Sequence, residues 1–324
     1  MIHNQWYAIL PSKSVKVGKI SAIKRLNLSL ALFRLQSGEL GCVADQCTHR
    51  GAALSKGIVK GNCIQCPFHG LEFNEKGKCT LIPANGKASI EDISRYNVKS
   101  YPVREKNGIV YVWYGEESKV TTNLPFFDDF VDESYSYSEI EDHWNSHYSR
   151  SVENQLDVVH LPFIHYNTIG KGNKTLVNGP KAEFDGTTLR TSASNQLDEG
   201  QTPNPASECV INKTTFLNFR FPNIWMNHIN EQLKVIIYFA PVDDENTILY
   251  IRFYCKISKC MFINSIIAYF GKFGNRVIER QDKRIVITQM PKASSLQSNE
   301  KLVSGDGPIV LYRTIREKLK NGEE

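Results

Sequence analysis

The chain has 324 residues, of which 41% are hydrophobic and 23% are charged, close to the averages of globular proteins. These values exclude a disordered or fibrous chain, and the length is enough for about two domains. Residues 1–120 carry 17 Lys/Arg against 9 Asp/Glu, whereas the rest carry 22 against 25. So moderate an excess does not indicate nucleic-acid binding. The positive charge of the first part is explained either by binding to an acidic protein partner or by a mixed, solvated surface.

The first residues and the cysteines bear on the compartment of the protein. The sequence begins MIHNQWYAILPSK, which has no basic stretch followed by an apolar run. The apolar segment at residues 260–270 is too short to cross a bilayer. We therefore expect a cytoplasmic protein without a membrane span. Its eight cysteines are then thiols or metal ligands rather than a disulfide framework.

Strand-like sequence dominates the first third of the chain. Three segments are rich in β-branched and aromatic residues: residues 28–35, 97–105 and 108–115. Turn sequences such as QSGE, NEKGK and EKNG separate them, so we predict a small all-β domain. A polar stretch at residues 116–125 follows, and the predicted domains are residues 1–118 and 119–324.

The second domain mixes helices with strands. Residues 151–160 are predicted to form a helix that Pro162 ends, and residues 270–290 to form a longer one. Four segments between these helices have strand composition: residues 187–194, 214–221, 233–242 and 247–257. We expect an α+β domain in which helices cover an antiparallel sheet.

Two short motifs in the first domain each combine a cysteine with a histidine. Cys47 and His49 are followed, after 16 residues, by Cys66 and His69. A Rieske [2Fe–2S] centre binds one iron through two cysteines and the other through two histidines, which suits two mixed loops. A structural zinc site is the alternative, although its usual signature keeps the cysteine pair and the histidine pair apart. Cys63 would serve that alternative; otherwise it is a small buried thiol.

A second group of potential ligands lies in ENQLDVVHLPFIH, residues 153–165. On a continuous helix, Asp157 and His160 would share one face. A helix end at Pro162 would let His165 turn back toward His160. Two imidazoles so placed bind one metal ion, and a facial triad needs one carboxylate besides.

Asp282 is the best candidate for that carboxylate. In the long predicted helix it shares a largely apolar stripe with Ile278 and Ile285. A carboxylate on such a face is costly to bury unless a metal ion or another partner compensates. Glu279 and Asp243 are the alternative donors.

These motifs are similar to those of the Rieske non-heme iron oxygenases. CTHRGAALSKG, CPFHGLEFNEKGKC, NQWYAIL and LIPA resemble the Rieske domain of that family. ENQLDVVHLPFIH, ERQDKRIVITQMP and PVDDENTIL resemble its catalytic domain. Rieske proteins of respiratory and photosynthetic complexes carry an additional, disulfide-forming cysteine in each loop, where this chain has Ala52 and Phe68. The resemblance therefore favours the oxygenase branch.

The resemblance implies a fold and a set of ligands. The fold is an all-β Rieske domain followed by an α+β catalytic domain. The implied ligands of the cluster are Cys47, His49, Cys66 and His69. The implied ligands of a mononuclear Fe(II) are His160, His165 and Asp282. In a head-to-tail homotrimer, Asp157 is implied to link His160 to His69 of a neighbouring subunit, and Asn154 to point toward the iron.

The implied activity is that of a terminal oxygenase, with O2 as co-substrate. Electrons come from NAD(P)H through a separate reductase or ferredoxin, since the chain has no G-x-G-x-x-G motif after a strand. Likeness to the vanillate-demethylase and steroid-hydroxylase branch implies hydroxylation or oxidative demethylation of an apolar or aromatic small molecule. The alternatives are an electron-transfer Rieske protein and a zinc-stabilised binding protein. Neither needs a facial triad.

Overall fold

Antiparallel strands make up the first of the two units into which the computed structural model divides the chain. The structure describes residues 1–323, and the first unit is His3–Leu124. Its strands form three sheets, in the orders β1-β10-β9, β2-β3-β4 and β5-β6-β7-β8. The bounds are β1 Gln5–Pro11, β2 Lys19–Arg25, β3 Leu28–Arg34, β4 Leu40–Ala44, β5 Ile58–Lys60, β6 Cys63–Gln65, β7 Glu72–Phe73, β8 Cys79–Leu81, β9 Val103–Lys106 and β10 Ile109–Tyr114.

The first unit has a core that anchors the two Cys/His loops. Phe33 of β3, Ile64 of β6 and Phe73 of β7 are fully buried in one cluster, because β-branched and aromatic side chains pack well on pleated sheets. Cys47 and Cys66 belong to the same cluster. The loops that follow β4 and β6 are therefore held at their cysteine ends by packing.

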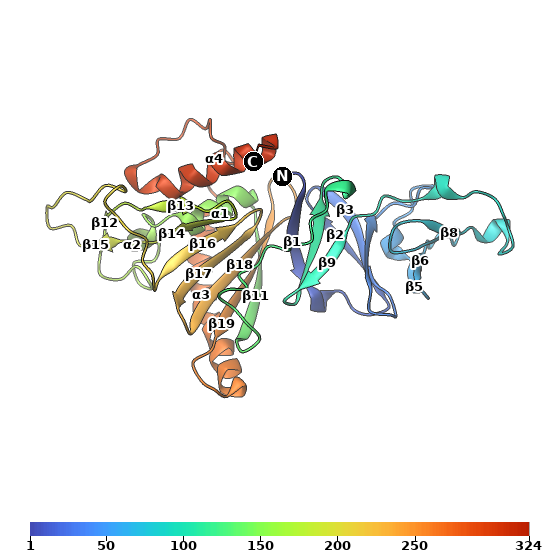
Figure 1. The fold of residues 1–324 in the computed structure, drawn as a ribbon, viewed down its shortest axis with the longest axis horizontal. Helices are drawn as coiled ribbons and strands as arrows, with labels where there is room; N and C mark the ends of the chain where they lie inside the picture. Colours follow the sequence, from blue (N-terminus) through green and yellow to red (C-terminus); the bar gives the residue numbers. More distant parts are fainter. Residues whose placement is uncertain (324) are drawn as a thin grey trace. The chain divides into compact units, whose positions relative to one another are not determined.

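A seven-stranded antiparallel sheet is the main part of the second unit, which comprises the residues from Pro125 onward together with Met1–Ile2. Its strand order is β11-β19-β18-β17-β16-β14-β13, and a separate ribbon pairs β12 with β15 (Figure 1). The bounds are β11 Ser136–Trp144, β12 Leu176–Val177, β13 Ala182–Phe184, β14 Thr188–Thr191, β15 Asn195–Gln196, β16 Phe216–Arg220, β17 Ile224–Asn230, β18 Leu233–Pro241 and β19 Thr247–Cys255.

Helices pack against this sheet. They are α1 Tyr148–Leu156, α2 Leu161–Ile164, α3 Met261–Val286 and α4 Gly307–Asn321. Helix α3 lies along β11 and β19, and α1 lies next to both α3 and α4. An all-β unit is thus followed by an antiparallel sheet with helices, which confirms the predicted fold class.

The helix predicted at residues 151–160 ends earlier in the structure than expected. Helix α1 stops at Leu156, because Asp157 takes an extended conformation with φ −76° and ψ 130°. Pro162 does not end a helix. It is the second residue of α2, where its missing N–H is no loss. Asp157 and His160 therefore lie on the link between two helices rather than on one helical face.

The long helix begins nine residues earlier than predicted and its inward stripe is shifted. Helix α3 starts at Met261 rather than at residue 270, and it ends at Val286. Its buried positions include Glu279, Asp282 and Val286, whereas Ile285 is exposed. None of the helices in residues 1–323 is long and apolar enough to cross a membrane.

A cavity of about 520 Å³ lies between the sheet and the helices. Alternate side chains of a strand point to one face, and the face lining the cavity carries Trp225 of β17, Ile237 of β18 and Ile251 of β19. These three residues form one row across the sheet, because Trp225 pairs with Ile237 and Ile237 with Ile251. The opposite wall comes from α1, the α1–α2 link and α3.

Candidate metal centres

The two Cys/His loops of the first unit close in the same way. The carbonyl of Cys47 accepts from the Gly51 amide at 2.8 Å, and the carbonyl of Cys66 accepts from the Gly70 amide at 3.1 Å. Both glycines have φ +75°, a conformation that costs other residues energy. The tight turns leave each cysteine buried and each histidine at the surface.

The side chains of the two loops lie close together. The imidazole rings of His49 and His69 have centroids 4.5 Å apart. Burial raises the pKa of the Cys47 thiol to about 11, and the adjacent Cys66 thiol adds to the rise. A pair of buried thiols is stable as thiolates only beside a positive charge, which a metal cluster supplies. Desolvation and the nearby His49 and Arg50 lower the pKa of His69, which favours the neutral, metal-binding imidazole.

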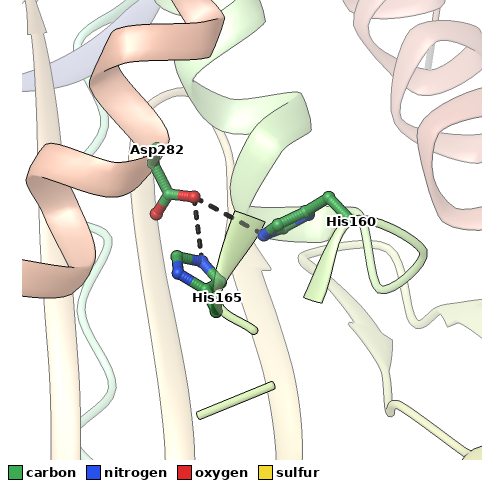
Figure 2. A group of neighbouring side chains, drawn as sticks. All are labelled: His160, His165 and Asp282. Carbon is green, nitrogen blue, oxygen red and sulfur yellow. Dashed lines mark ion pairs between the residues drawn. The ribbon is translucent and has the colours of Figure 1, made fainter. Parts of the chain in front are cut away.

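In the second unit, His160, His165 and Asp282 converge on one point (Figure 2). One potential ligand atom from each lies within 4.8 Å of the other two. Oδ1 of Asp282 is 3.0 Å from Nε2 of His165 and 3.5 Å from Nε2 of His160. The rings are inclined at 65° to each other, with centroids 5.2 Å apart. Two imidazoles and a carboxylate arranged on one side of a point are the donor set of a facial triad.

The buried atoms of this group are left in need of a ligand. Asp282 is 3% exposed, and its Oδ1 accepts no hydrogen bond from any residue that the structure describes. Burial disfavours the charged form of His165, but the Asp282 carboxylate and the Gln281 side chain together outweigh burial and raise the pKa of His165. A metal cation would satisfy the oxygen and replace the proton. The residues therefore fit a bound divalent metal ion.

The far nitrogen of each imidazole faces an oxygen atom. Nδ1 of His160 lies 3.2 Å from Oδ2 of Asp157, and Nδ1 of His165 lies 2.9 Å from Oε1 of Gln281. Gln281 is the kind of outer partner that fixes the tautomer of a metal-binding histidine, so that Nε2 of His165 is free for the metal. Nδ1 of His160, in contrast, forms no hydrogen bond with any residue that the structure describes. Asp157 was among the predicted site residues, but Gln281 was not.

Asn154 and Gln155 also reach the site from the end of α1. Both line the cavity, and Nδ2 of Asn154 is buried without a partner among residues 1–323. Nε2 of Gln155 lies 3.5 Å from Oδ2 of Asp282, a contact that the sequence did not predict. The three converging side chains thus line one side of the cavity, and apolar residues of the sheet line its floor.

The two alternative carboxylates have other partners. Oε1 of Glu279 accepts a hydrogen bond from the indole of Trp144 at 2.7 Å. Burial and the neighbouring Asp142 raise the pKa of Glu279 to about 8. Asp243 stabilises the turn between β18 and β19 by accepting from the Asn246 side chain at 2.7 Å. Neither belongs to the converging group found in the described part of the chain.

Buried ion pairs hold α1, which leads into Asp157. Glu153 accepts from Arg313 of α4 at 2.8 Å, and Oε2 of Glu153 lies 3.2 Å from Arg150. Both arginines also contact Glu300, at 2.6 and 2.7 Å. Each charge in this group has opposite charges around it, as burial requires. The group ties α1 to α4 and so fixes the direction in which the site residues leave α1.

Two family models match this chain. Residues 5–102 match the Rieske [2Fe-2S] domain, and residues 144–322 match the vanillate O-demethylase oxygenase C-terminal domain. The second match alone covers more than half of the chain. The chain therefore belongs to the Rieske oxygenase family, in the group with the vanillate O-demethylase type of C-terminal domain.

Curated relatives are similar to this chain in sequence over part of their length. A cholesterol 7-desaturase of Xenopus laevis is 36% identical over 166 residues, which are 50% of this chain and 36% of the relative. The oxygenase component of dicamba O-demethylase from Stenotrophomonas maltophilia is 32% identical over 166 residues, 51% of this chain and 48% of the relative. The alignments thus span less than half of the length of these relatives.

Solved structures share the fold. The structure of NdmA from Pseudomonas putida CBB5 superposes with a TM-score of 0.79 and 22% identity, over 98% of this chain and 90% of that one. At this identity the likeness concerns the fold alone. It covers both units of the chain.

Proposed function

We propose that this chain is the terminal oxygenase component of a multicomponent Rieske oxygenase. It would take electrons from a separate reductase or ferredoxin and use O2 to hydroxylate or oxidatively demethylate an apolar or aromatic small molecule. The observation that carries the proposal is the convergence of His160, His165 and Asp282 beside a cavity, in a chain with a Rieske domain.

The proposed domains are residues 1–118 for the cluster and 119–324 for the mononuclear iron. Cys47, His49, Cys66 and His69 would bind the [2Fe–2S] cluster. His160, His165 and Asp282 would bind Fe(II). When bound, the cluster supplies single electrons and the ferrous ion supplies open positions at which O2 is activated.

The side chains around these ligands would position and connect them. Asp157 would hold the Nδ1 proton of His160 on one side and contact His69 of a neighbouring subunit on the other. Its side chain is 24% exposed, and His69 lies at the surface, so both are accessible to such a partner. A repeated head-to-tail contact of this kind closes into a ring, here a homotrimer. Asn154 would direct its unpartnered amide into the cavity.

The cavity sets the class of substrate. Its floor of Trp225, Ile237, Leu249 and Ile251 is apolar and would exclude water from the reacting group. An electron carrier would need no such cavity next to a facial triad. That contrast supports the oxygenase over the electron-transfer alternative.

Nitric oxide tests the open metal position without a known substrate. The chain is loaded with cluster and Fe(II) under nitrogen, exposed to nitric oxide and measured by EPR. We expect a ferrous-nitrosyl signal in the wild type and its loss in His160→Ala, which should keep the Rieske signal. A panel of methoxybenzoates and sterols, incubated with 18O2 and a surrogate reductase, then identifies the product by mass spectrometry. A fully loaded chain that never binds nitric oxide would contradict the proposal.

A further inference from the structure

The first half of α3 presents large apolar side chains to solvent. Phe262 is 73% exposed and Phe270 is 64% exposed, whereas phenylalanine is among the residues most often buried. The full set, called here the α3 apolar face, is Met261, Phe262, Ile263, Ile266, Tyr269, Phe270, Phe273 and Val277. Contiguous exposed apolar surface of this kind indicates an interaction site.

The orientation of α3 is inverted relative to an ordinary surface helix. Its small and polar residues face the sheet: Asn264 and Ala268 are buried, and the backbone of Gly271 packs on the ring of Phe253. Hydrogen bonds fix this orientation, because Ser138 of β11 donates to the Ala268 carbonyl and Ser136 to the Met261 carbonyl. The large residues cannot turn inward without breaking these contacts. A surface helix normally buries its apolar stripe.

The charge around this face is positive. Residues 246–278 contain no Asp or Glu. Lys259 and Arg276 are exposed at the two ends of the face, and Nζ of Lys272 lies 3.8 Å from the ring centroid of Tyr269. Lys256 is also near, but it pairs with Asp132 at 3.3 Å. Aromatic and aliphatic residues bordered by lysine and arginine are the pattern of helices that lie in the membrane interface.

We infer that the α3 apolar face docks the protein on the surface of an anionic phospholipid membrane. The aromatic residues would enter the boundary between headgroups and acyl chains, while Lys259, Lys272 and Arg276 would meet the phosphates. The helix lies on the membrane under this proposal and does not cross it. The proposal is independent of the oxygenase activity.

A second copy of this chain is the less favoured occupant. A two-fold contact through this face would bring Lys259, Lys272 and Arg276 of the two copies together, and no carboxylate of the segment would neutralise them. The face is also distant from the contact proposed for electron transfer. Phe270 and Phe262 precede Asp282 by 12 and 20 residues on one helix, which is about 18 and 30 Å.

The position of the face also bears on substrate access. The second half of α3 lines the cavity with Asn275, Ile278 and Asp282. The membrane contact and the cavity wall are thus parts of one rigid helix. Docking would hold the cavity near the lipid bilayer, in which apolar compounds dissolve.

Sedimentation with vesicles tests the proposal on the full, metal-loaded chain. We expect the wild type to sediment with vesicles of phosphatidylcholine and phosphatidylglycerol, more weakly with phosphatidylcholine alone, and less at high salt. The double variant Phe262→Ser/Phe270→Ser should lower the partition coefficient at least about tenfold on both vesicles. The double variant Lys259→Glu/Arg276→Glu should lower it at least about tenfold on the anionic vesicles only.

Controls separate docking from misfolding and from self-association. The variant Leu197→Ser/Val210→Ser changes apolar residues that are 48% and 84% exposed outside α3, and it should bind vesicles like the wild type. Circular dichroism and the visible spectrum of the cluster verify that each variant folds. Unchanged vesicle binding by the phenylalanine variant would overturn the proposal. The proposal would also be overturned if the wild type did not bind vesicles and the phenylalanine variant lost the oligomeric state that the wild type shows on gel filtration.

Discussion

Nδ1 of His165 lies 2.9 Å from Oε1 of Gln281, the residue that precedes Asp282 on α3. One turn of one helix therefore supplies both the carboxylate that faces the imidazole and the acceptor that orients it. Gln281 is itself held, since Thr168 donates to its Oε1 at 2.9 Å and its amide donates to Asn167 at 2.7 Å. The His165 ring is thus fixed before any metal ion binds.

Replacing Gln281 should weaken metal binding. Gln281→Leu leaves the Nδ1 proton of His165 without an acceptor, and losses of such outer partners typically reduce metal affinity about 10- to 100-fold. Gln281→Glu keeps an acceptor oxygen and should retain most of the affinity. Titration of the apo chain with Fe(II) against a chelator measures the difference. Equal affinities in Gln281→Leu and the wild type would show that this contact does not orient the ligand.

Replacing Asp157 should separate metal binding from turnover. Asp157→Ala removes the carboxylate 3.2 Å from His160, while the proposed ligands of both metals remain. We expect full iron content but a fall of about 100-fold in the rate at which substrate and O2 reoxidise the reduced cluster. Stopped-flow absorbance measures that rate. Asp157→Asn preserves the size of the side chain and serves as the folding control. Normal turnover in Asp157→Ala would refute the bridging role.

The sequence motifs predicted that Asp157 and His160 lie close together, but the helix expected to place them there was wrong. Asp157 and His160 were expected to be close because a helix would place them on one face. They are close because α1 ends at Leu156 and the link to α2 folds back. A proline after a helical pattern is typical both of a helix end and of the first turn of the next helix, and only the tertiary fold decides between them.

Glu153 should matter for stability more than for chemistry. It is 4% exposed and lies between Arg150 and Arg313. Glu153→Ala leaves two buried guanidinium groups short of an anion, and we expect a loss of about 3–5 kcal/mol in the free energy of unfolding. The exposed pair of Glu141 and His143 is the matched comparison, and Glu141→Ala should cost less than about 1 kcal/mol. Urea unfolding measures both. Similar losses in the two variants would contradict the structural role of Glu153.

Glu279 should give the protein a specific pH dependence. Burial first, and then Asp142, raise its pKa from 4.5 to about 8, so the native state holds a proton that the unfolded chain has lost. Burial alone would raise the pKa of Asp142 too, but Glu279 and Lys283 outweigh it and lower that pKa. The proton therefore resides on Glu279.

The contribution of Glu279 to stability is complete below the pKa of the unfolded chain and is lost as the pH rises through about 8. Between these limits its share of the slope approaches about 1.4 kcal/mol per pH unit. Glu279→Gln cannot titrate and should flatten the profile measured by urea unfolding from about pH 5 to pH 9. An unchanged slope in Glu279→Gln would mean that Glu279 is already ionised in the folded protein.

Two features of the site and fold had no usable signal in the sequence. Gln281 is an ordinary polar residue of a helix until α2 brings His165 beside it. The start of α3 at Met261 was missed because its first turns carry large apolar residues on the side away from the sheet, so they do not show the stripe of a packed helix. Spacing within a short motif is visible in one sequence, whereas contacts across more than 100 residues are not.

Under the proposed function, one chain holds a Rieske cluster and a separate iron bound by His160, His165 and Asp282. Low-temperature EPR of the anaerobically purified, dithionite-reduced protein, with iron, zinc and sulfide counted in the same sample, tests it most directly. We expect a Rieske signal with about three irons and two sulfides per chain, and about two irons in His160→Ala. Zinc without a Rieske signal, or a wild type that holds only two irons even after ferrous reconstitution, would contradict it.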